Sequence, residues 1–126
     1  MAQAYANEEI AIIPSASYAV TKVTTDQINV CGVSALTVIL DSTAVGTATL
    51  LMTIDGKDKT SGKYYNLLTG AAISTNATTR YKISPYLANV VNATANDLVP
   101  VIFRITVTQG GTGNATYSLG YTLLRG

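Results

Sequence analysis

The stretch TATLLMTID, residues 47–55, decides the fold class, because its side chains alternate between apolar and polar. The apolar set consists of Ala48, Leu50, Met52 and Ile54. Threonines and an aspartate occupy the positions between them, with Leu51 as the exception. Successive side chains of a β-strand point to opposite faces of the sheet, so this two-residue period predicts a strand with one buried face.

The same period recurs towards the carboxyl end, over residues 101–108 and 116–123. The predicted inward residues are Val101, Phe103, Ile105 and Val107 in the first segment, and Tyr117, Leu119, Tyr121 and Leu123 in the second. The glycine-rich sequence QGGTGN lies between the two segments. Glycine and asparagine supply the backbone conformations of tight reversals, so these two strands are predicted to form a hairpin.

Weaker strand signals lie at residues 18–24, 35–41, 64–68 and 78–84. Their expected inward residues are Leu36, Val38, Leu40, Tyr81 and Ile83. The sequence Ser84-Pro85-Tyr86-Leu87 has the pattern of a helix cap followed by proline, which predicts a helix of one or two turns. About seven short strands separated by turn signals favour an all-β domain, a single antiparallel β-sandwich of jelly-roll-like or Ig-like type, over residues 15–126.

Residues 1–14 show no sustained period, and we interpret them as an extended N-terminal arm. The arm carries three isoleucines, Ile10, Ile12 and Ile13, which are candidates for docking on a neighbouring chain. A short arm buries too little apolar surface to be ordered alone, so a partner is one way to hold it. A first edge strand of the same domain is the alternative, and the sequence leaves both open.

The composition argues against several functional classes. Of 126 residues, 12% are charged, and the net charge is +1, so there is no basic stripe of the kind that binds nucleic acid. We expect no membrane association, because no signal-peptide pattern and no run of about 18 apolar residues occurs. Production in the cytoplasm is expected accordingly. The single cysteine, Cys31, rules out an internal disulfide and is interpreted as a small core residue.

Catalysis is not expected, and neither a cofactor site nor a metal site is predicted. The chain contains no histidine, and Asp41, Asp55, Asp58 and Asp97 fall in predicted turns or strand ends, where aspartate bonds to local amides. A glycan-binding module is the alternative, because tyrosines on a sandwich can stack sugar rings. The tyrosines considered are Tyr64, Tyr65, Tyr81, Tyr86, Tyr117 and Tyr121.

The segment GKDKTSGKYY, residues 56–65, superficially resembles a phosphate-binding loop. Its glycines are one residue too far apart, and Tyr64 stands where the magnesium-binding hydroxyl should be. We therefore predict a tight reversal that begins at Asp55-Gly56. Lys57, Lys59 and Lys63 would lie at an exposed loop tip, with Tyr64 beside them. These four residues are candidates for contacting an acidic partner surface, although solubility alone would also explain the lysines.

Three segments, residues 54–73, 79–108 and 115–124, resemble small virion structural proteins of tailed phages. The shared pattern consists of turn and packing residues, at Gly56 to Asp58, Ser61 to Tyr65, Tyr81 to Ile83, Pro85 to Leu87, Asn96 to Pro100 and Ile102 to Leu124. The sequence departs from the pattern at Tyr86, where glycine is absent.

This resemblance implies a bacteriophage virion protein of the capsid decoration or cement type. Such a protein would lie on the capsid surface, bind across neighbouring subunits of the major capsid protein, and form a homotrimer. A tail or connector component is the structural alternative. In each case the protein needs no catalytic site, because it acts by binding to other proteins of the particle.

Overall fold

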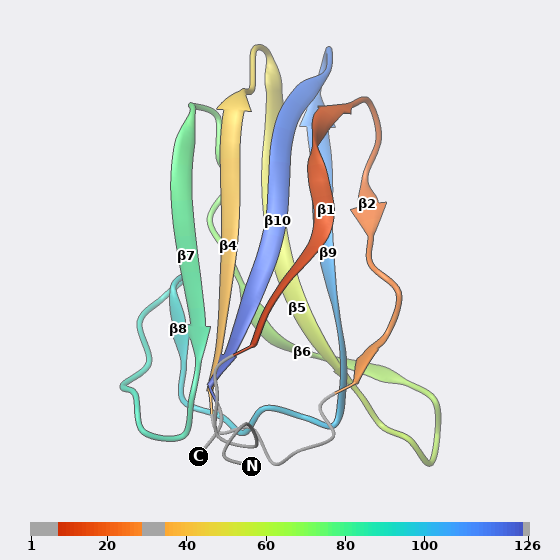
Figure 1. The fold of residues 1–126 in the computed structure, drawn as a ribbon, viewed down its shortest axis with the longest axis vertical. Helices are drawn as coiled ribbons and strands as arrows, with labels where there is room; N and C mark the ends of the chain where they lie inside the picture. Colours follow the sequence, from red (N-terminus) through yellow and green to blue (C-terminus); the bar gives the residue numbers. More distant parts are fainter. Residues whose placement is uncertain (1–7, 29–34, 125–126) are drawn as a thin grey trace.

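The computed structural model describes residues 8–28 and 35–124, and every regular element in these ranges is a β-strand. The strands form two sheets that face each other (Figure 1). The first sheet contains, in spatial order, β1 (Glu8–Tyr18), β10 (Ala115–Leu124), β4 (Ala35–Ala44), β7 (Ala77–Ile83) and β8 (Thr94–Ala95). The second contains β2 (Lys22–Val23), β9 (Ile102–Gly111), β5 (Ala48–Lys57) and β6 (Tyr64–Thr69), and β3 (Gln27–Ile28) also pairs with β9.

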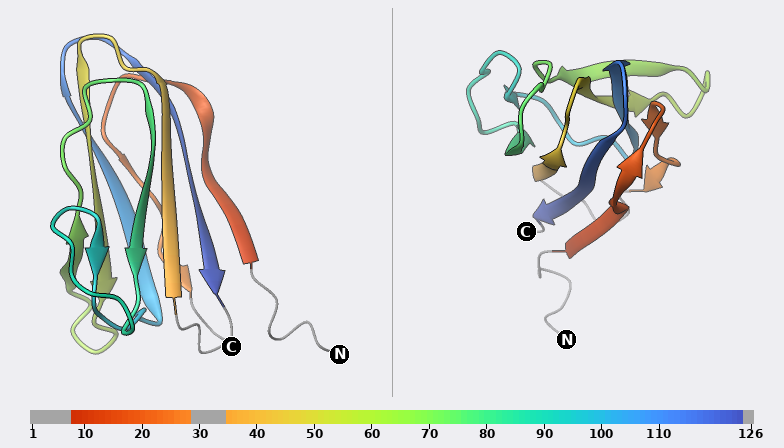
Figure 2. Two further views of the ribbon diagram at one scale, coloured as in Figure 1. Left: turned by 90° about the vertical axis from the view of Figure 1, so that its left-hand side faces the viewer. Right: turned by 90° about the horizontal axis from the view of Figure 1, so that it is seen from above.

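All strand pairs are antiparallel except β7 with β8. The two layers are visible from the side and from above (Figure 2). The predicted all-β sandwich is therefore confirmed.

The core lies between the sheets and is built from the alternating positions that the sequence predicts. Leu50, Met52 and Ile54 of β5 are completely buried, as are the predicted inward residues of β4. The rings of Phe103 and Tyr121 meet edge to face across the core, with centroids 5.4 Å apart. The prediction for Val101 is wrong, since this side chain is 61% exposed. Strand β9 starts only at Ile102, so Val101 precedes the paired backbone.

Residues 8–14 belong to the sandwich, because β1 runs through the expected boundary at residue 14 and pairs with β10. The register shifts between Ile13 and Ala16, around Pro14. Proline lacks the amide hydrogen, so an edge strand with a bulge is where a sheet tolerates it. Of the two arrangements that the sequence leaves open, these residues take the edge strand. Residues 1–7 and Cys31 lie outside the described ranges.

The predicted continuous strand over residues 18–24 is wrong. The chain bends at Ala19 and Val20 and passes from the first sheet to the second, where only Lys22–Val23 pair as a strand. Side chains replace part of the missing backbone pairing, because the hydroxyls of Thr21 and Thr24 accept hydrogen bonds from amides of β9.

The helix predicted after Ser84 is also wrong, and residues 84–87 form a single turn. The amide of Tyr86 donates to the Ser84 hydroxyl oxygen at 3.2 Å, and the amide of Leu87 donates to the Ser84 carbonyl at 3.4 Å. The amide of Ser84 itself donates to Ala95 of β8. Because β8 pairs with the end of β7, the chain at residues 84–87 makes one turn and does not continue as a helix.

Candidate functional site

One end of the sandwich carries most of the exposed apolar side chains. Seven of the nine exposed large hydrophobic residues of the described chain lie there, on β3, at the start of β6 and in the connection from β7 to β9. They are Ile28, Tyr65, Tyr86, Val90, Val91, Leu98 and Val101. We call this set of residues the apolar end; the elements that carry it lie in the lower half of Figure 1. The other two residues, Val20 and Val23, lie beside and in β2.

The connection over residues 84–101 is held in shape by its own backbone. The amides of Ala93 and Thr94 both donate to the carbonyl of Val90, and the amide of Val90 donates to Thr94, at 2.9–3.0 Å. The tip residue Asn92 has a φ of 62°, a left-handed conformation that asparagine tolerates well. The amide of Asn96 donates to the side-chain oxygen of Asn89 at 2.7 Å.

The result is a preformed apolar surface. Val91 and Tyr86 are 86% and 85% exposed, on a segment fixed to β7 through β8. Exposed large apolar residues that gather in one region mark interaction sites more often than single, scattered ones do. Little conformational entropy has to be given up when a preformed surface binds, which favours its use in docking.

Reasoning from the sequence missed Val90, Val91, Leu98 and Ile28 as candidate site residues. Most of them lie in the segment LANVVNATANDLVP, in which apolar residues follow neither a strand nor a helix period. The sequence signal that could have identified them is the lack of periodicity. Large apolar residues are scattered among asparagines and alanines in a segment between two predicted strands. Such residues have no core face and must either be exposed or cover the end of the core.

The predicted lysine loop forms, but it begins later than expected. Gly56 lies within β5, paired with Tyr65 and Phe103, so the predicted reversal at Asp55-Gly56 is wrong. The turn spans residues 58–63, where the amide of Asp58 donates to the carbonyl of Lys63 and the amide of Gly62 to that of Asp58. The Asp58 carboxylate accepts bonds from the Ser61 hydroxyl and the Thr60 amide, and these bonds lower its pKa.

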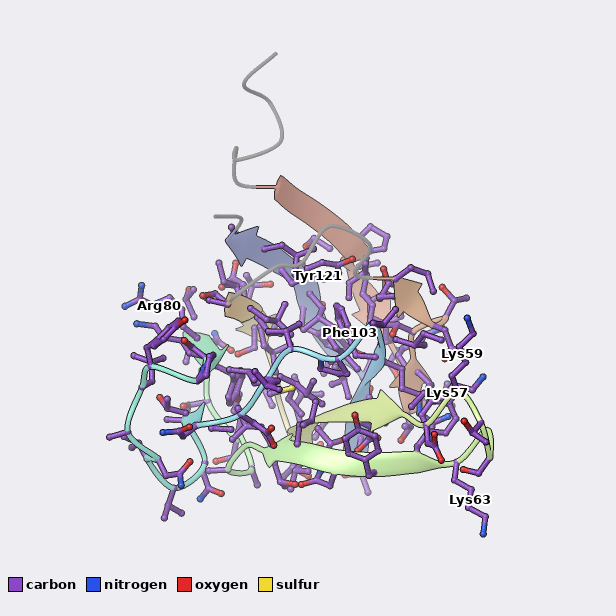
Figure 3. The ribbon with its side chains drawn as sticks, turned by 90° about the horizontal axis from the view of Figure 1, so that it is seen from below. Lys57, Lys59, Lys63, Arg80, Phe103 and Tyr121 are labelled. Atoms are coloured by element: carbon purple, nitrogen blue, oxygen red, sulfur yellow. The ribbon has the colours of Figure 1, made fainter. Side chains whose placement is uncertain are left out.

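Lys59 and Lys63 extend from this turn into solvent (Figure 3). Neither forms an ion pair with any residue in the described part of the chain. These two members of the predicted loop site are therefore available to a partner.

Lys57 and Tyr64 have a different role, because both contact Asp26 on the outer face of the second sheet. The Tyr64 hydroxyl donates to Asp26 at 2.6 Å, and the Lys57 ammonium donates to the other carboxylate oxygen at 3.0 Å. The bonds from Tyr64 and Lys57 lower the pKa of Asp26, and the bond to Asp26 raises the pKa of Lys57. The Arg104 guanidinium lies 3.5 Å from the centre of the Tyr64 ring and near Asp55. Both predicted site residues are therefore engaged within the protein.

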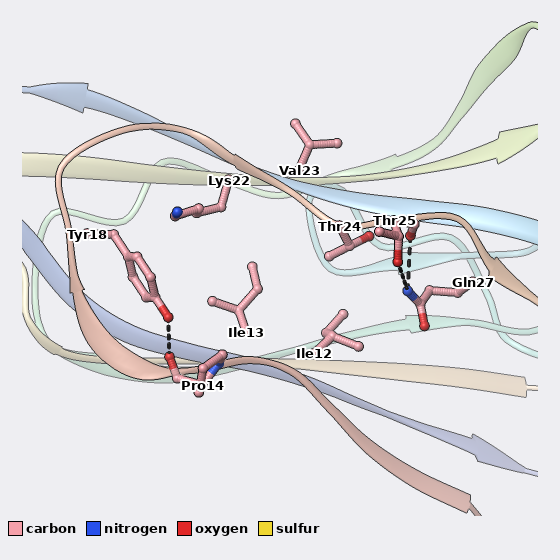
Figure 4. A pocket seen from close by; sticks show the side chains of 9 residues that line it. All are labelled: Ile12, Ile13, Pro14, Tyr18, Lys22, Val23, Thr24, Thr25 and Gln27. Carbon is pink, nitrogen blue, oxygen red and sulfur yellow. Dashed lines mark hydrogen bonds between the residues drawn. The ribbon is translucent and has the colours of Figure 1, made fainter.

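A groove lies along the open edge between β1 and β2, and Figure 4 shows its lining. Its volume is about 470 Å³, and its lining residues are Ile12, Ile13, Pro14, Tyr18, Lys22, Val23, Thr24, Thr25 and Gln27. Ile13 packs into the hydrophobic core, and Ile12 is half-buried against it. These two isoleucines, predicted to dock on a neighbouring chain, thus help to close their own domain. The side chain of Ile10 lies outside the described residues.

The tyrosines do not form a common platform. Tyr81, Tyr117 and Tyr121 are buried, and the Tyr64 ring is covered by Arg104. Of the six tyrosines considered, only Tyr65 and Tyr86 are exposed.

The aspartates split into two groups. Asp58 and Asp97 bond to local amides as predicted, whereas Asp41 and Asp55 lie within strands, where Asp41 accepts a bond from Thr78 and Asp55 from Asn66. Within the described ranges, no three acidic or cysteine side chains are grouped so that they could hold a metal ion. Residues 8–28 and 35–124 also contain no helix long and apolar enough to cross a bilayer.

The architecture defines a largely antiparallel β-sandwich protein, most of whose exposed large apolar residues lie towards one end. No family model and no curated protein matches the sequence. Among solved structures, a chain in the structure of infectious bursal disease virus, Gx strain, aligns over 94% of this chain and 31% of its own length, with a TM-score of 0.50 and 14% identity. The corresponding values for the Gt strain are 94%, 33%, 0.49 and 13%. The crystal structure of PirA aligns over 94% of this chain and 93% of its own length, with a TM-score of 0.41 and 12% identity.

The chain thus spans less than two thirds of the two virus chains that it matches. At 14% identity, the likeness to the Gx strain chain shows a shared fold alone.

Proposed function

We propose that this chain is a non-enzymatic structural protein of a bacteriophage particle, a capsid decoration or cement protein. The observation that carries the proposal is the apolar end, where Tyr86, Val90, Val91 and Leu98 are held exposed on a preformed connection. Its fold, shared with part of a chain from a virus structure, is compatible with this role.

In this role the protein lies on the capsid surface and contacts neighbouring subunits of the major capsid protein through the apolar end. Burial of exposed apolar area at about 25 cal/mol per Å² would supply most of the attraction. A homotrimer on a threefold site would engage several subunits at once, so that release requires all contacts to break together. The protein would be made in the host cytoplasm and act as part of the virion.

The non-enzymatic part of the proposal is supported by the state of the aspartates. Each of the described aspartates accepts hydrogen bonds from its own chain, most of them from side chains or amides that fix a turn or a strand edge. These carboxylates therefore have a structural role in the fold.

The test uses purified protein and capsids from which the protein is absent. We expect addition at a fixed stoichiometry and a rise in the temperature at which the capsid disrupts. A double variant, Tyr86→Ser with Val91→Ser, should bind at least about tenfold more weakly while unfolding at the wild-type temperature, since both side chains are exposed. Val20→Ser is the matched control, because Val20 is 62% exposed but lies outside the apolar end.

Several outcomes would contradict the proposal. Failure to bind any capsid removes the decoration role, and binding confined to tails or connectors moves the protein to that part of the particle. Equal loss in the double variant and in Val20→Ser would show that the apolar end is not the contact surface.

A further inference from the structure

A groove opens at the apolar end between the β5–β6 hairpin and the segment that leads into β9. It has a volume of about 510 Å³ and is lined by Lys57, Asp58, Lys59, Tyr65, Pro100, Val101 and Ile102. Three consecutive apolar residues, Pro100 to Ile102, form one wall, and the exposed ring of Tyr65 adds to the lining. Volumes of several hundred Å³ fit a short peptide segment or a small molecule.

The Tyr65 ring lies over Gly56, its partner across the β5–β6 pair. A Cβ atom at position 56 would lie only 2.5 Å from the ring carbon that carries the hydroxyl and 2.6 Å from the hydroxyl oxygen. No side chain other than hydrogen leaves room for the ring in this position. Gly56 therefore leaves the space that the Tyr65 ring occupies beside the groove.

The turn beside the groove carries two exposed lysines. Lys59 lies in the lining, and Lys63 projects from the same turn in a different direction (Figure 3). Asp58 lies in the lining too, and the bonds from Ser61 and Thr60 lower its pKa and keep it charged, whereas Lys57 is paired with Asp26. Neither Lys59 nor Lys63 forms an ion pair in the described part of the chain, so the turn keeps an excess of positive charge.

We propose that this groove binds an extended segment of a partner protein in which an aliphatic side chain is flanked by Asp or Glu. The aliphatic side chain enters between Tyr65 and Val101, a flanking carboxylate pairs with Lys59 of the lining, and the charge of Lys63 on the same turn adds attraction at longer range. Both apolar contact and charge complementarity are then satisfied, and the sign of the charge selects the partner. The identity of that partner as a capsid subunit rests on the proposed function, whereas the chemistry of the groove does not.

The test is a titration with short peptides, followed through the backbone amide resonances of the isotope-labelled protein. The probe is a capped Gly-Glu-Leu-Glu-Gly peptide, and the controls replace leucine by serine or both glutamates by lysine. We expect binding with a Kd of about 1 mM, shifts centred on Tyr65, Val101 and Ile102, and a clear weakening with added salt.

Two sets of variants locate the interaction. The double variant Lys59→Glu with Lys63→Glu should bind the glutamate peptide about fivefold to tenfold more weakly than the wild type does. The same variant should bind the lysine-flanked peptide better than the wild type does. Arg80→Glu with Lys82→Glu makes the same charge change on β7 and should have little effect; Arg80 points away from the lysine turn (Figure 3). Val101→Ser should weaken binding about threefold or more, and the equally exposed Val20→Ser should not.

Three results would overturn the inference: no binding of the glutamate peptide, equal binding of the lysine-flanked peptide, or shifts centred away from the groove. Peptide binding with the expected selectivity, together with failure to bind capsids, would uphold the groove and reject the decoration role. The two proposals therefore fail separately.

Discussion

The hydroxyl of Tyr64 donates a 2.6 Å hydrogen bond to the carboxylate of Asp26, a residue 38 positions earlier in the sequence. This bond joins β6 to the segment between β2 and β3, two parts of the second sheet that are not neighbours in its strand order. The bond from Lys57 to the same carboxylate adds β5 to this connection. The segment around β2 and β3, which has few backbone pairs, is thereby held to the outer face of the second sheet.

Removing either partner of this bond should destabilise the protein, and the effect should depend on acid pH. The pKa of Asp26 is lowered by the bond from Tyr64, so its contribution is present above the ordinary value of 3.8 and is lost as pH falls below it. We expect Asp26→Asn and Tyr64→Phe each to lower the melting temperature at pH 7, and the double variant to lower it by less than their sum. The gap between wild type and Asp26→Asn should close as pH falls below 3.8. Strictly additive effects, or a gap independent of pH, would contradict this interpretation.

Two buried tyrosines should respond oppositely to loss of the hydroxyl group. The Tyr117 hydroxyl is buried and has no hydrogen-bond partner among residues 8–28 and 35–124, whereas the Tyr121 hydroxyl donates to Gln27 at 2.9 Å. An unsatisfied buried hydroxyl costs free energy, so Tyr117→Phe should leave stability unchanged or raise it by about 1 kcal/mol. Tyr121→Phe should lower stability by about 1 kcal/mol. Denaturant unfolding of the two variants measures both values, and equal losses would contradict the assignment.

Alkaline pH should reveal Tyr117 separately. Burial raises the pKa of Tyr117 to about 12, above the ordinary value of 10.0. The Tyr117 hydroxyl therefore loses its proton at a lower pH in the unfolded chain than in the folded protein. Its contribution to the free energy of unfolding is fully present below pH 10 and is lost progressively as pH rises towards 12. In Tyr117→Phe this part of the decline should be absent. Unfolding curves at a series of pH values for both proteins provide the comparison; parallel declines would contradict the prediction.

Two glycines with left-handed backbones should differ in their tolerance of alanine. Gly62 has a φ of 75°, and a Cβ atom added there would have no heavy atom of the described chain within 4 Å, so Gly62→Ala should cost about 1 kcal/mol for the backbone alone. Gly111 has a φ of 72°, and an added Cβ would clash with the backbone carbonyl of Thr47. Gly111→Ala should therefore cost at least about twice as much, since backbone must move. Similar unfolding free energies for the two variants would show that the strands relax freely there.

Deletion of residues 1–13 should destabilise the domain as a whole. The deletion removes Ile13 from the core and the backbone of residues 8–13 from its pairing with β10. Loss of one buried isoleucine side chain alone costs about 2–5 kcal/mol, so a fall in melting temperature of well over 5 °C is expected. A truncated protein with the wild-type melting temperature would instead favour an arm that serves only a partner. Circular dichroism during heating distinguishes the two results.

The regular part of the fold follows from the sequence because burial imposes a period on it. Leu50, Met52 and Ile54 alternate with polar residues, and each is buried between the sheets. The period cannot say where pairing starts, which is why it wrongly predicts a core position for Val101, an apolar residue in phase with β9 but outside it.

The candidate surfaces were harder to predict, for two physical reasons. The apolar end is formed by loop residues such as Val91, for which no period exists. The engagement of Lys57 and Tyr64 depends on Asp26, which comes from a distant part of the chain, and nothing local to residues 57–64 indicates it. Lys59 and Lys63, which have no such distant partner among the described residues, are exposed as predicted.

Because most of the exposed large apolar residues lie towards one end, the two ends of the sandwich differ in chemistry. The turn at residues 112–114, between β9 and β10, is exposed and lies at the opposite end of the same strands. A foreign peptide or a fluorescent label inserted into that turn would point away from whatever the apolar end covers. This hairpin is therefore the place at which the sandwich could be converted into a display scaffold.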